Sequence, residues 1–263
     1  MTALTEASET GSPPAMLTYG ATKFLRDVWT VLEMKSLFIL RGWFLWAIRP
    51  LIFPLGILFW LTILAPGDPE SSRRILTGAL IFGFSLSATN MLTQQLIQDR
   101  FLGRLKLIIT LPVSKAAYCF GVLAFATMTT APIVILLLGV APLLDVDFEL
   151  TWVFFPLILP TLFIMGGITF VIASYAPSME AGSIMGNIFG VVMVIISPVF
   201  FTMDQAPVAL RWLGWVSPMR YAADGVMKSL SGQTDVWLEF LILIGFATVI
   251  TGLGLWKMKW REY

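Results

Sequence analysis

The stretch AAYCFGVLAFATMTTAPIVILLLGV, residues 116–140, contains no acidic or basic side chain. An α-helix needs about 20 consecutive apolar residues to cross the hydrocarbon core of a bilayer, so this stretch is long enough. The strands of a membrane barrel would alternate polar and apolar residues, which this stretch does not do, and lipid permits few other structures. Residues 116–140 therefore predict a transmembrane helix.

Five further apolar stretches predict transmembrane helices in the same way, near residues 44–64, 75–96, 152–175, 183–201 and 236–256. Pro50 and Pro54 indicate a kink or a late start in the first of them. The expected fold class is an all-α membrane protein with six transmembrane helices, in a single transmembrane domain over residues 19–263.

The composition supports this fold and excludes a soluble enzyme. Of the 263 residues, 57% are hydrophobic and 13% are charged, whereas soluble domains contain roughly 25% charged residues. The formal net charge of +1 does not favour nucleic acid as a partner. Histidine is absent and Cys119 is the only cysteine, which removes the commonest general base, an intrachain disulfide and a zinc site. We expect no catalytic residue and no metal site in this chain.

The N-terminal region divides into two parts. Residues 1–18 are mostly small and polar and lack the basic start and apolar core of a signal peptide, so we expect a disordered cytosolic tail. Residues 19–41 alternate apolar and charged side chains at helical spacing, which predicts an amphipathic helix on the membrane surface. A helix docked on the protein is the alternative.

Lysine and arginine residues in the short connections indicate the orientation. With both termini in the cytoplasm, twelve of the seventeen bases lie inside, and the remaining five lie outside: Arg73, Arg74, Arg211, Arg220 and Lys228. We therefore expect cytoplasmic N- and C-termini.

The connection between the second and third predicted spans reads QDRFLGRLKLIITLPVS, residues 98–114. Its apolar residues have helical spacing, and its basic residues lie elsewhere around the helix. Pro112 ends the helix and Ser114 can cap the next one. The sequence predicts a short amphipathic helix in a tight cytoplasmic loop. Such a helix passes on motion only if another protein pushes on it. A basic loop resting on the lipid headgroups is the alternative.

The connection between the fifth and sixth spans, residues 202–235, is too apolar for a free loop. Pro207, Pro218 and Gly225 interrupt it too often for a full span. Short helices that enter the outer leaflet and return would satisfy their backbone groups there. An ordinary outer loop with one surface helix is the alternative.

These two connections carry motifs known from one transporter family. The first motif consists of Asp99, Gly103-Arg104-Leu105, Leu111-Pro112-Val113-Ser114 and Tyr118. The second consists of Ser197-Pro198 through Phe201, Pro207, Leu210-Arg211 and Ser217-Pro218 through Tyr221. Their order and spacing resemble type-2 ABC exporter permeases, closest to the daunorubicin type and related to the capsule and O-antigen exporters. The six-span layout agrees over nearly the whole chain.

The resemblance implies the permease subunit of an ATP-driven exporter. Such a subunit pairs with itself as a homodimer and with two copies of a cytosolic ABC ATPase, which binds the ATP and Mg. The implied coupling region comprises Asp99, Arg100, Gly103, Arg104, Leu105, Leu111 and Pro112. The implied re-entrant region comprises Pro198, Pro207, Arg211, Pro218 and Tyr221. Family members commonly carry glutamate at the position of Asp99, which is one methylene shorter.

The resemblance also implies a prokaryotic cell-membrane location and contact with membrane lipid. The substrate would be an amphipathic drug, a lipid or a lipid-linked glycan. No G-x-x-x-x-G-K-[ST] motif occurs in the chain, so it does not hold a nucleotide phosphate in the usual way. The predicted spans offer almost no carboxylate for a proton relay. A secondary transporter or channel without an ATPase, or a membrane scaffold protein, remains the alternative.

Two predicted spans contain candidates for the dimer interface or the pore. Gly182, Gly186 and Gly190 form a stripe of small residues on the fifth span, which indicates either the subunit interface or close packing within one subunit. The second span is rich in hydroxyl and amide side chains, which predict a buried face that bonds an amphipathic substrate or only other helices. Its candidates are Ser85, Thr89, Asn90 and Thr93.

Overall fold

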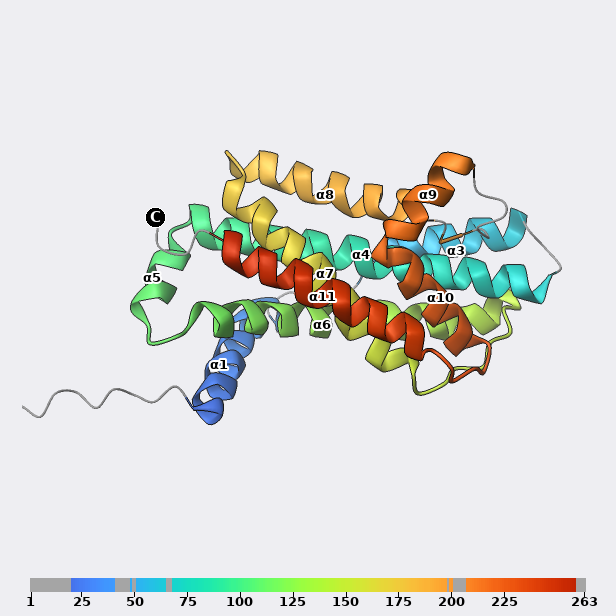
Figure 1. The fold of residues 1–263 in the computed structure, drawn as a ribbon, viewed down its shortest axis with the longest axis horizontal. Coiled ribbons are helices and arrows are strands. Elements are labelled where there is room, and N and C mark those ends of the chain that lie inside the picture. Colours follow the sequence, from blue (N-terminus) through green and yellow to red (C-terminus); the bar gives the residue numbers. More distant parts are fainter. Residues whose placement is uncertain are drawn as a thin grey trace, which may run out of the picture.

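The computed structural model describes residues 20–40, 48, 51–64, 68–197, 199–200 and 207–258. Within these ranges the chain forms a bundle of helices (Figure 1), which confirms the all-helical fold. The elements are α1 (Ala21–Leu40), α3 (Ile52–Leu64), α4 (Pro69–Phe101), α5 (Arg104–Thr110), α6 (Lys115–Val140), the 3-10 helix η1 (Ala141–Leu144), α7 (Phe154–Tyr175), α8 (Met179–Ile196), α9 (Val208–Val216), α10 (Pro218–Leu230) and α11 (Trp237–Lys257).

Five helices in the described part of the chain are long and apolar enough to cross a membrane: α4, α6 continued by η1, α7, α8 and α11. Each overlaps one of the predicted spans. The stretch predicted as the first span, residues 44–64, lies partly outside the described residues. Its described part contains α3, whose 13 residues are fewer than a bilayer crossing requires. The tail predicted over residues 1–18 also lies outside the described residues.

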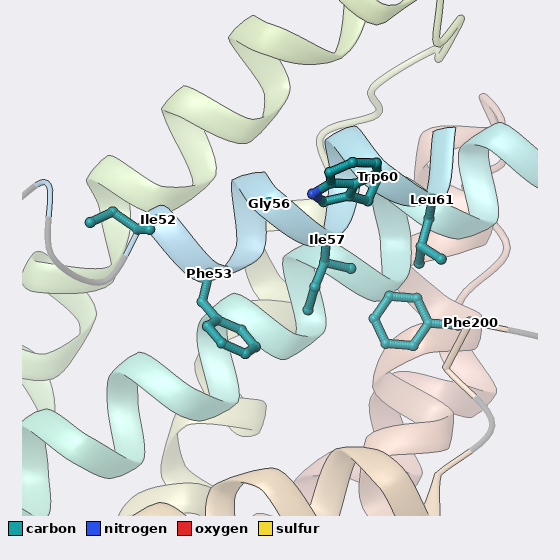
Figure 2. Close-up of a pocket in the computed structure, with 7 residues that line it drawn as sticks. All are labelled: Ile52, Phe53, Gly56, Ile57, Trp60, Leu61 and Phe200. Carbon is teal, nitrogen blue, oxygen red and sulfur yellow. The ribbon is translucent and has the colours of Figure 1, made fainter. Parts of the chain in front are cut away.

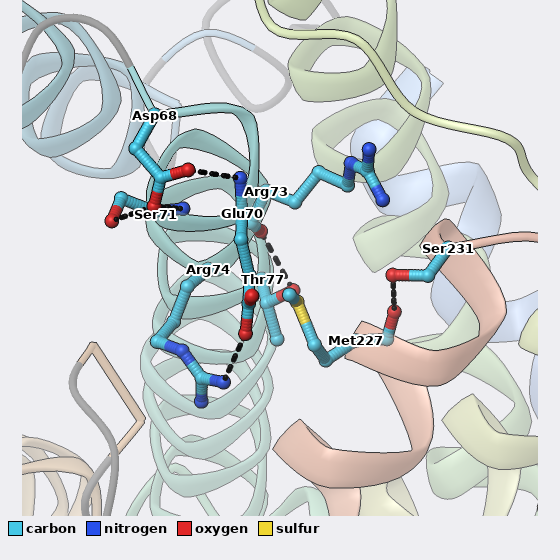
Figure 3. A network of polar contacts seen from close by, with 8 residues as sticks. All are labelled: Asp68, Glu70, Ser71, Arg73, Arg74, Thr77, Met227 and Ser231. Atoms are coloured by element: carbon cyan, nitrogen blue, oxygen red, sulfur yellow. Dashed lines mark hydrogen bonds and ion pairs between the residues drawn. The ribbon is translucent and has the colours of Figure 1, made fainter.

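Helix α4 is the central helix of the bundle. It packs against α3, α6, α7, α8 and α10 and is almost entirely buried. The helix begins after Asp68, whose carboxylate accepts hydrogen bonds from the backbone N–H groups of Glu70 and Ser71 (Figure 3). It is longer than the predicted span over residues 75–96 because this cap starts it early and because it continues to the turn at Gly103.

Buried apolar side chains form two groups. The larger group lies among α3, α4, α6, α7, α10 and α11 and includes the rings of Phe84 and Phe154. The smaller group lies at the end of the bundle that carries α5, and it includes Leu105 and Ile108 of that helix. Short helix α5 is therefore seated in the bundle through its own apolar residues.

Helices α7 and α11 approach each other closely at two glycines. A Cβ atom on Gly254 would lie 2.2 Å from the main-chain oxygen of Gly167, so a side chain there would push the helices apart. Small residues allow such close approach between membrane helices. This contact is not among the predictions from the sequence, although Gly166, Gly167, Gly252 and Gly254 occur in the two predicted spans concerned.

The two ends of the bundle differ in what they carry. The beginning of α1 and the end of α11 lie toward the same end as α5, whereas α9 and α10 lie toward the opposite end (Figure 1). We call these the α5 end and the α10 end. Helix α1 lies obliquely across α6 at the α5 end.

Candidate functional site

The turn between α4 and α5 is made by Gly103, which has a left-handed conformation with φ 73°. Glycine adopts this conformation without steric cost, so it can reverse the chain directly after α4. Leu105 and Ile108 of α5 are buried, whereas Arg104, Lys106 and Leu107 are exposed. The predicted amphipathic helix is present, with its apolar face in the bundle and a mixed basic and apolar face outward.

The end of this segment also agrees with the prediction from the sequence. Leu111 and Pro112 follow α5 and are exposed. The Ser114 hydroxyl accepts a hydrogen bond from the backbone N–H of Ala117 at 3.1 Å and so caps α6. The outward side chains of residues 104–112, other than the buried Leu105 and Ile108 and the half-buried Ile109, thus form a surface between the end of α4 and the start of α6.

Asp99 lies beneath this surface rather than on it. Its side chain is 1% exposed, and its Oδ2 accepts a hydrogen bond from the Tyr118 hydroxyl at 2.6 Å. The Lys35 ammonium of α1 forms an ion pair with the same oxygen and also donates to Gln95 Oε1 at 3.3 Å. The acid that the resemblance assigned to the partner contact therefore bonds to α1 and α6 of its own chain.

Lys35 was not among the site residues expected from the sequence. It lies one helical turn after Val31, on the face of α1 that packs against α6, so its position on the apolar face is the signal that could have found it. Burial lowers the pKa of the Lys35 ammonium below its usual range, and the neighbouring Asp99 carboxylate opposes this shift.

Helix α1 is docked on the protein through that face. Val31 lies directly against Gly121 of α6, at a point where a side chain on residue 121 would not fit. On the side of α1 that faces away from α6, Leu25 and Trp29 are 65% and 64% exposed. Helix α1 thus packs on α6 and also has exposed apolar side chains of the kind found at a membrane surface.

Arg100 also bonds to another helix of its own chain, which the sequence did not indicate. Its Nη1 donates to the main-chain oxygens of Ala173 and Ala176, at 3.0 and 2.8 Å. These oxygens belong to the end of α7, where helix carbonyl groups lack partners and a positive charge is favourable. Lys115 similarly donates to the main-chain oxygen of Met258, at 2.7 Å, just after α11. The two basic side chains join the α5 end to α7 and α11.

The glycine stripe of α8 packs within the same chain. Gly182, Gly186 and Gly190 are buried against α4, at Ile97, Thr93 and Thr89 respectively. The stripe is therefore a site of close packing between α8 and α4 of one chain.

The hydroxyl face of α4 is also internal. Ser85, Thr89 and Thr93 are at most 1% exposed, and Asn90 is half-buried. Ser85 donates to the Met219 sulfur at 3.2 Å and Thr89 donates to the Met165 sulfur at 3.6 Å. The Ser85 and Thr89 hydroxyl groups thus bond other helices, whereas Thr93 Oγ1 has no hydrogen-bond partner among the described residues.

The opposite face of α8 is exposed and largely apolar, with two exposed polar side chains, Glu180 in the first turn and Asn187. Ile184, Ile188 and Ile195 are each more than half exposed. Asn187, at the middle of the helix, is exposed among them and donates only to the main-chain oxygen of Ser183, one turn earlier, within the described residues. An amide in this position is costly against lipid and can bond a neighbouring helix.

An open apolar groove runs beside α3. It has a volume of about 480 Å³ and is lined by Ile52, Phe53, Gly56, Ile57, Trp60 and Leu61 of α3 and by Phe200 (Figure 2). Phe200 follows α8, and its ring lies directly over Gly78 of α4. The groove thus lies at the junction of the exposed surfaces of α3 and the end of α8.

The segment expected to be re-entrant forms two short helices, α9 and α10. Pro207 immediately precedes α9, Arg211 is exposed within it, and Pro218 is the first residue of α10. The Tyr221 hydroxyl donates to the main-chain oxygen of Trp215 at 3.0 Å and so fixes the corner between the helices. Pro198 lies outside the described residues. Because α10 packs against α4, α7 and α11, the segment is not a free loop.

Both motif regions fall within one family match. Residues 26–231 match the model of the family described as "ABC-2 type transporter", over more than half of the chain. A search of curated proteins gives no match. The matched range contains α4, the α5 turn, the α8 stripe and the α9–α10 segment. The chain therefore belongs to the ABC-2 type transporter family and is a multi-pass membrane permease component of such a transporter.

Proposed function

We propose that the chain is the permease subunit of an ATP-driven exporter in a prokaryotic cell membrane, acting as a homodimer with two copies of a cytosolic ABC ATPase. Permeases of this family normally pair with such an ATPase. The partner binds ATP and Mg, because this chain has no phosphate-binding loop of the usual sequence. The α5 end then faces the cytoplasm, which agrees with the excess of lysine and arginine around it.

The observation that carries this proposal is the division of α5 into two faces. Leu105 and Ile108 are each 4% exposed, while Arg104, Lys106 and Leu107 face outward. A helix that only rested on lipid headgroups would not need two anchors in the bundle core. Seated in this way, α5 offers a basic and apolar surface to a partner and transmits a push to α4 and α6.

The mechanism we propose is a rigid-body movement driven from the α5 end. ATP binding brings the two ATPase chains together, and they displace α5 through Arg104, Leu107, Leu111 and Pro112. Helices α4 and α8 move together, because the glycine stripe holds them in direct contact. Relative movement of the two subunits opens a path outward, as in other alternating-access transporters. Asp99 and Arg100 act from inside by holding the end of α4 to its neighbours.

The exposed face of α8 is our candidate for the homodimer contact. Asn187 supports this, because an exposed amide at the middle of an apolar helix is stabilised by bonding to another helix. The apolar groove beside α3 supports an amphipathic or lipid-like substrate, because all its lining side chains are apolar. We therefore propose an amphipathic drug, a lipid or a lipid-linked glycan as substrate.

The proposal is tested by co-expressing the chain with each ABC ATPase of its source organism in turn and purifying the complexes. We expect one ATPase to be retained with two copies of each chain, and Arg104→Glu or Leu107→Glu to lower its affinity by about tenfold. The charge change Asp147→Arg, in the loop after η1 at the opposite end, is the control. Equal effects of Asp147→Arg and Arg104→Glu would contradict the proposal.

A transport measurement separates the proposal from its alternatives. Proteoliposomes containing the complex are loaded with ATP and tested with a fluorescent amphipathic dye and a fluorescent phospholipid. Movement of either probe that requires ATP and is lost in Leu107→Glu supports an exporter. Movement driven by an ion gradient in liposomes with this chain alone indicates a secondary transporter, and no ATPase binding together with no movement indicates a scaffold.

A further inference from the structure

The ion pair between Lys35 and Asp99 joins two segments that are far apart in sequence. Lys35 belongs to α1, which lies outside the candidate membrane-spanning helices, and Asp99 belongs to the last turn of α4, directly before the Gly103 turn and α5. The side chains are 6% and 1% exposed, so this is an interior contact and not a surface ion pair. The Tyr118 hydroxyl of α6 donates to the same carboxylate at 2.6 Å.

Charges buried in this way are not interchangeable with apolar contacts. Removing one member of a buried ion pair leaves the other charge without compensation, whereas removing both can be nearly neutral. Oδ1 of Asp99 is buried and accepts no hydrogen bond from the described residues, so the carboxylate depends on the groups that reach Oδ2. Separation of α1 from α4 would therefore be costly as long as both groups are charged.

From this geometry we infer that Lys35 is a positioning residue of the coupling segment and that α1 moves as one unit with the α4–α5 turn. A displacement of α5 is transmitted to Asp99 through the four intervening residues, 100–103. The ion pair with Lys35 then transmits it to α1. Val31, one turn earlier on α1, packs on α6 and keeps the two helices aligned. The inference rests on the proposed role of α5 in coupling. The Lys35–Asp99 connection between α1 and α4, however, is a property of this chain alone.

The test compares four variants in a Cys119→Ala background. Lys35→Met removes the charge and keeps the length of the side chain, and Lys35→Arg keeps the charge. Lys35→Met combined with Asp99→Asn removes both charges. Arg26→Met, on the exposed face of α1, is the matched control because it removes a cation from the same helix. Spin labels at Glu33→Cys on α1 and Thr110→Cys on α5, both exposed positions, report the distance between the helices.

We expect a single narrow distance distribution in the unsubstituted chain, in Lys35→Arg and in Arg26→Met. Lys35→Met should broaden it, and the added Asp99→Asn should narrow it again. In the complex with the ATPase, the α1–α5 distance should remain the same with and without ATP and vanadate. Lys35→Met should lower ATP hydrolysis by about tenfold without lowering the amount of ATPase bound, since coupling between contacting residues commonly has this size.

Three results would overturn the inference. The first is a Lys35→Met chain that behaves like Arg26→Met, and the second is a double variant whose distance distribution is as broad as that of Lys35→Met. The third is an α1–α5 distance in the complex that changes with ATP and vanadate. If the unsubstituted chain binds no ATPase, the proposed function fails. The spin-label comparison on the chain alone then still decides whether the Lys35–Asp99 ion pair holds α1 to the α4–α5 turn.

Discussion

Gly186 of α8 lies directly against Thr93 of α4, so close that a Cβ atom on Gly186 would be 2.6 Å from Thr93 Oγ1. The Thr93 hydroxyl is buried and has no hydrogen-bond partner among the described residues. The contact therefore depends on steric fit. Because glycine has no side chain, α8 leaves room for the Thr93 side chain of α4. Such contacts bring membrane helices together where no difference in hydrophobicity drives them.

This contact predicts that Gly186→Val destabilises the chain. The added methyl groups would separate α4 from α8, at a cost of about 2 kcal/mol and a lowering of Tm of about 6 °C. The single buried cysteine, Cys119, gives a direct measurement, because a thiol-reactive dye labels it only when the bundle opens. Gly245→Val in α11 is the matched control, since nothing lies within 4 Å of a Cβ atom there. Equal Tm values for the two variants would contradict the packing described.

The second prediction concerns Arg100. Replacement by glutamine should cost about 2 kcal/mol, because it removes charge-assisted hydrogen bonds to the last carbonyl groups of α7. Hydrogen exchange measured by mass spectrometry should show faster exchange in the last turn of α7, and Arg100→Lys should have a smaller effect. Lys106→Gln, on the exposed face of α5, removes a nearby charge and should leave this exchange unchanged. If Lys106→Gln has the same effect, the exchange rate of α7 depends on the overall positive charge near α5 and not on the hydrogen bonds of Arg100.

The third prediction concerns Asn187 and the proposed homodimer. If the exposed face of α8 contacts a second subunit, Asn187→Leu should weaken the dimer by about 1 kcal/mol, or about fivefold in its dissociation constant. Native mass spectrometry or single-molecule photobleaching in lipid discs measures this constant. Thr248→Val removes an exposed hydroxyl from the outer face of α11 and should leave the dimer unchanged. A dimer that is unaffected or strengthened by Asn187→Leu places the subunit contact elsewhere.

Most of the helices could be predicted from the sequence, because a bilayer leaves few structures open to a long apolar stretch. The amphipathic character of α5 and the cap at Ser114 followed from spacing alone. The partners of the polar side chains could not be predicted in the same way. Asp99 and Arg100 belong to a stretch whose composition is that of an exposed basic loop. Their side chains nevertheless bond to α1 and α7, which are distant in sequence. Similarly, the glycine stripe has the same spacing whether its neighbour is α4 or a second subunit.

The fourth prediction concerns the first turn of α4, at the α10 end. The Asp68 carboxylate accepts hydrogen bonds from the Ser71 hydroxyl at 2.8 Å and from the Ser71 N–H at 3.2 Å. These bonds, that of the Ser71 hydroxyl above all, hold the pKa of Asp68 below its ordinary value of 3.8. At neutral pH the ionised side chain caps the helix, so Asp68→Ala should lower Tm, while Asp68→Asn, which can still accept these bonds, should lower it less.

The pH dependence of this cap has a defined sign. A carboxylate whose pKa is lower in the folded state contributes stability above its unfolded pKa, and this contribution is lost as pH falls through the lower, folded value. The difference in Tm between the unsubstituted chain and Asp68→Ala should therefore be constant from neutral pH down to the region of 3.8 and should shrink below it. Asp147→Ala, in the exposed loop after η1, is the matched control for removing one surface carboxylate. A Tm difference for Asp68→Ala that does not change on acidification would mean that the charge of Asp68 plays no part in starting α4.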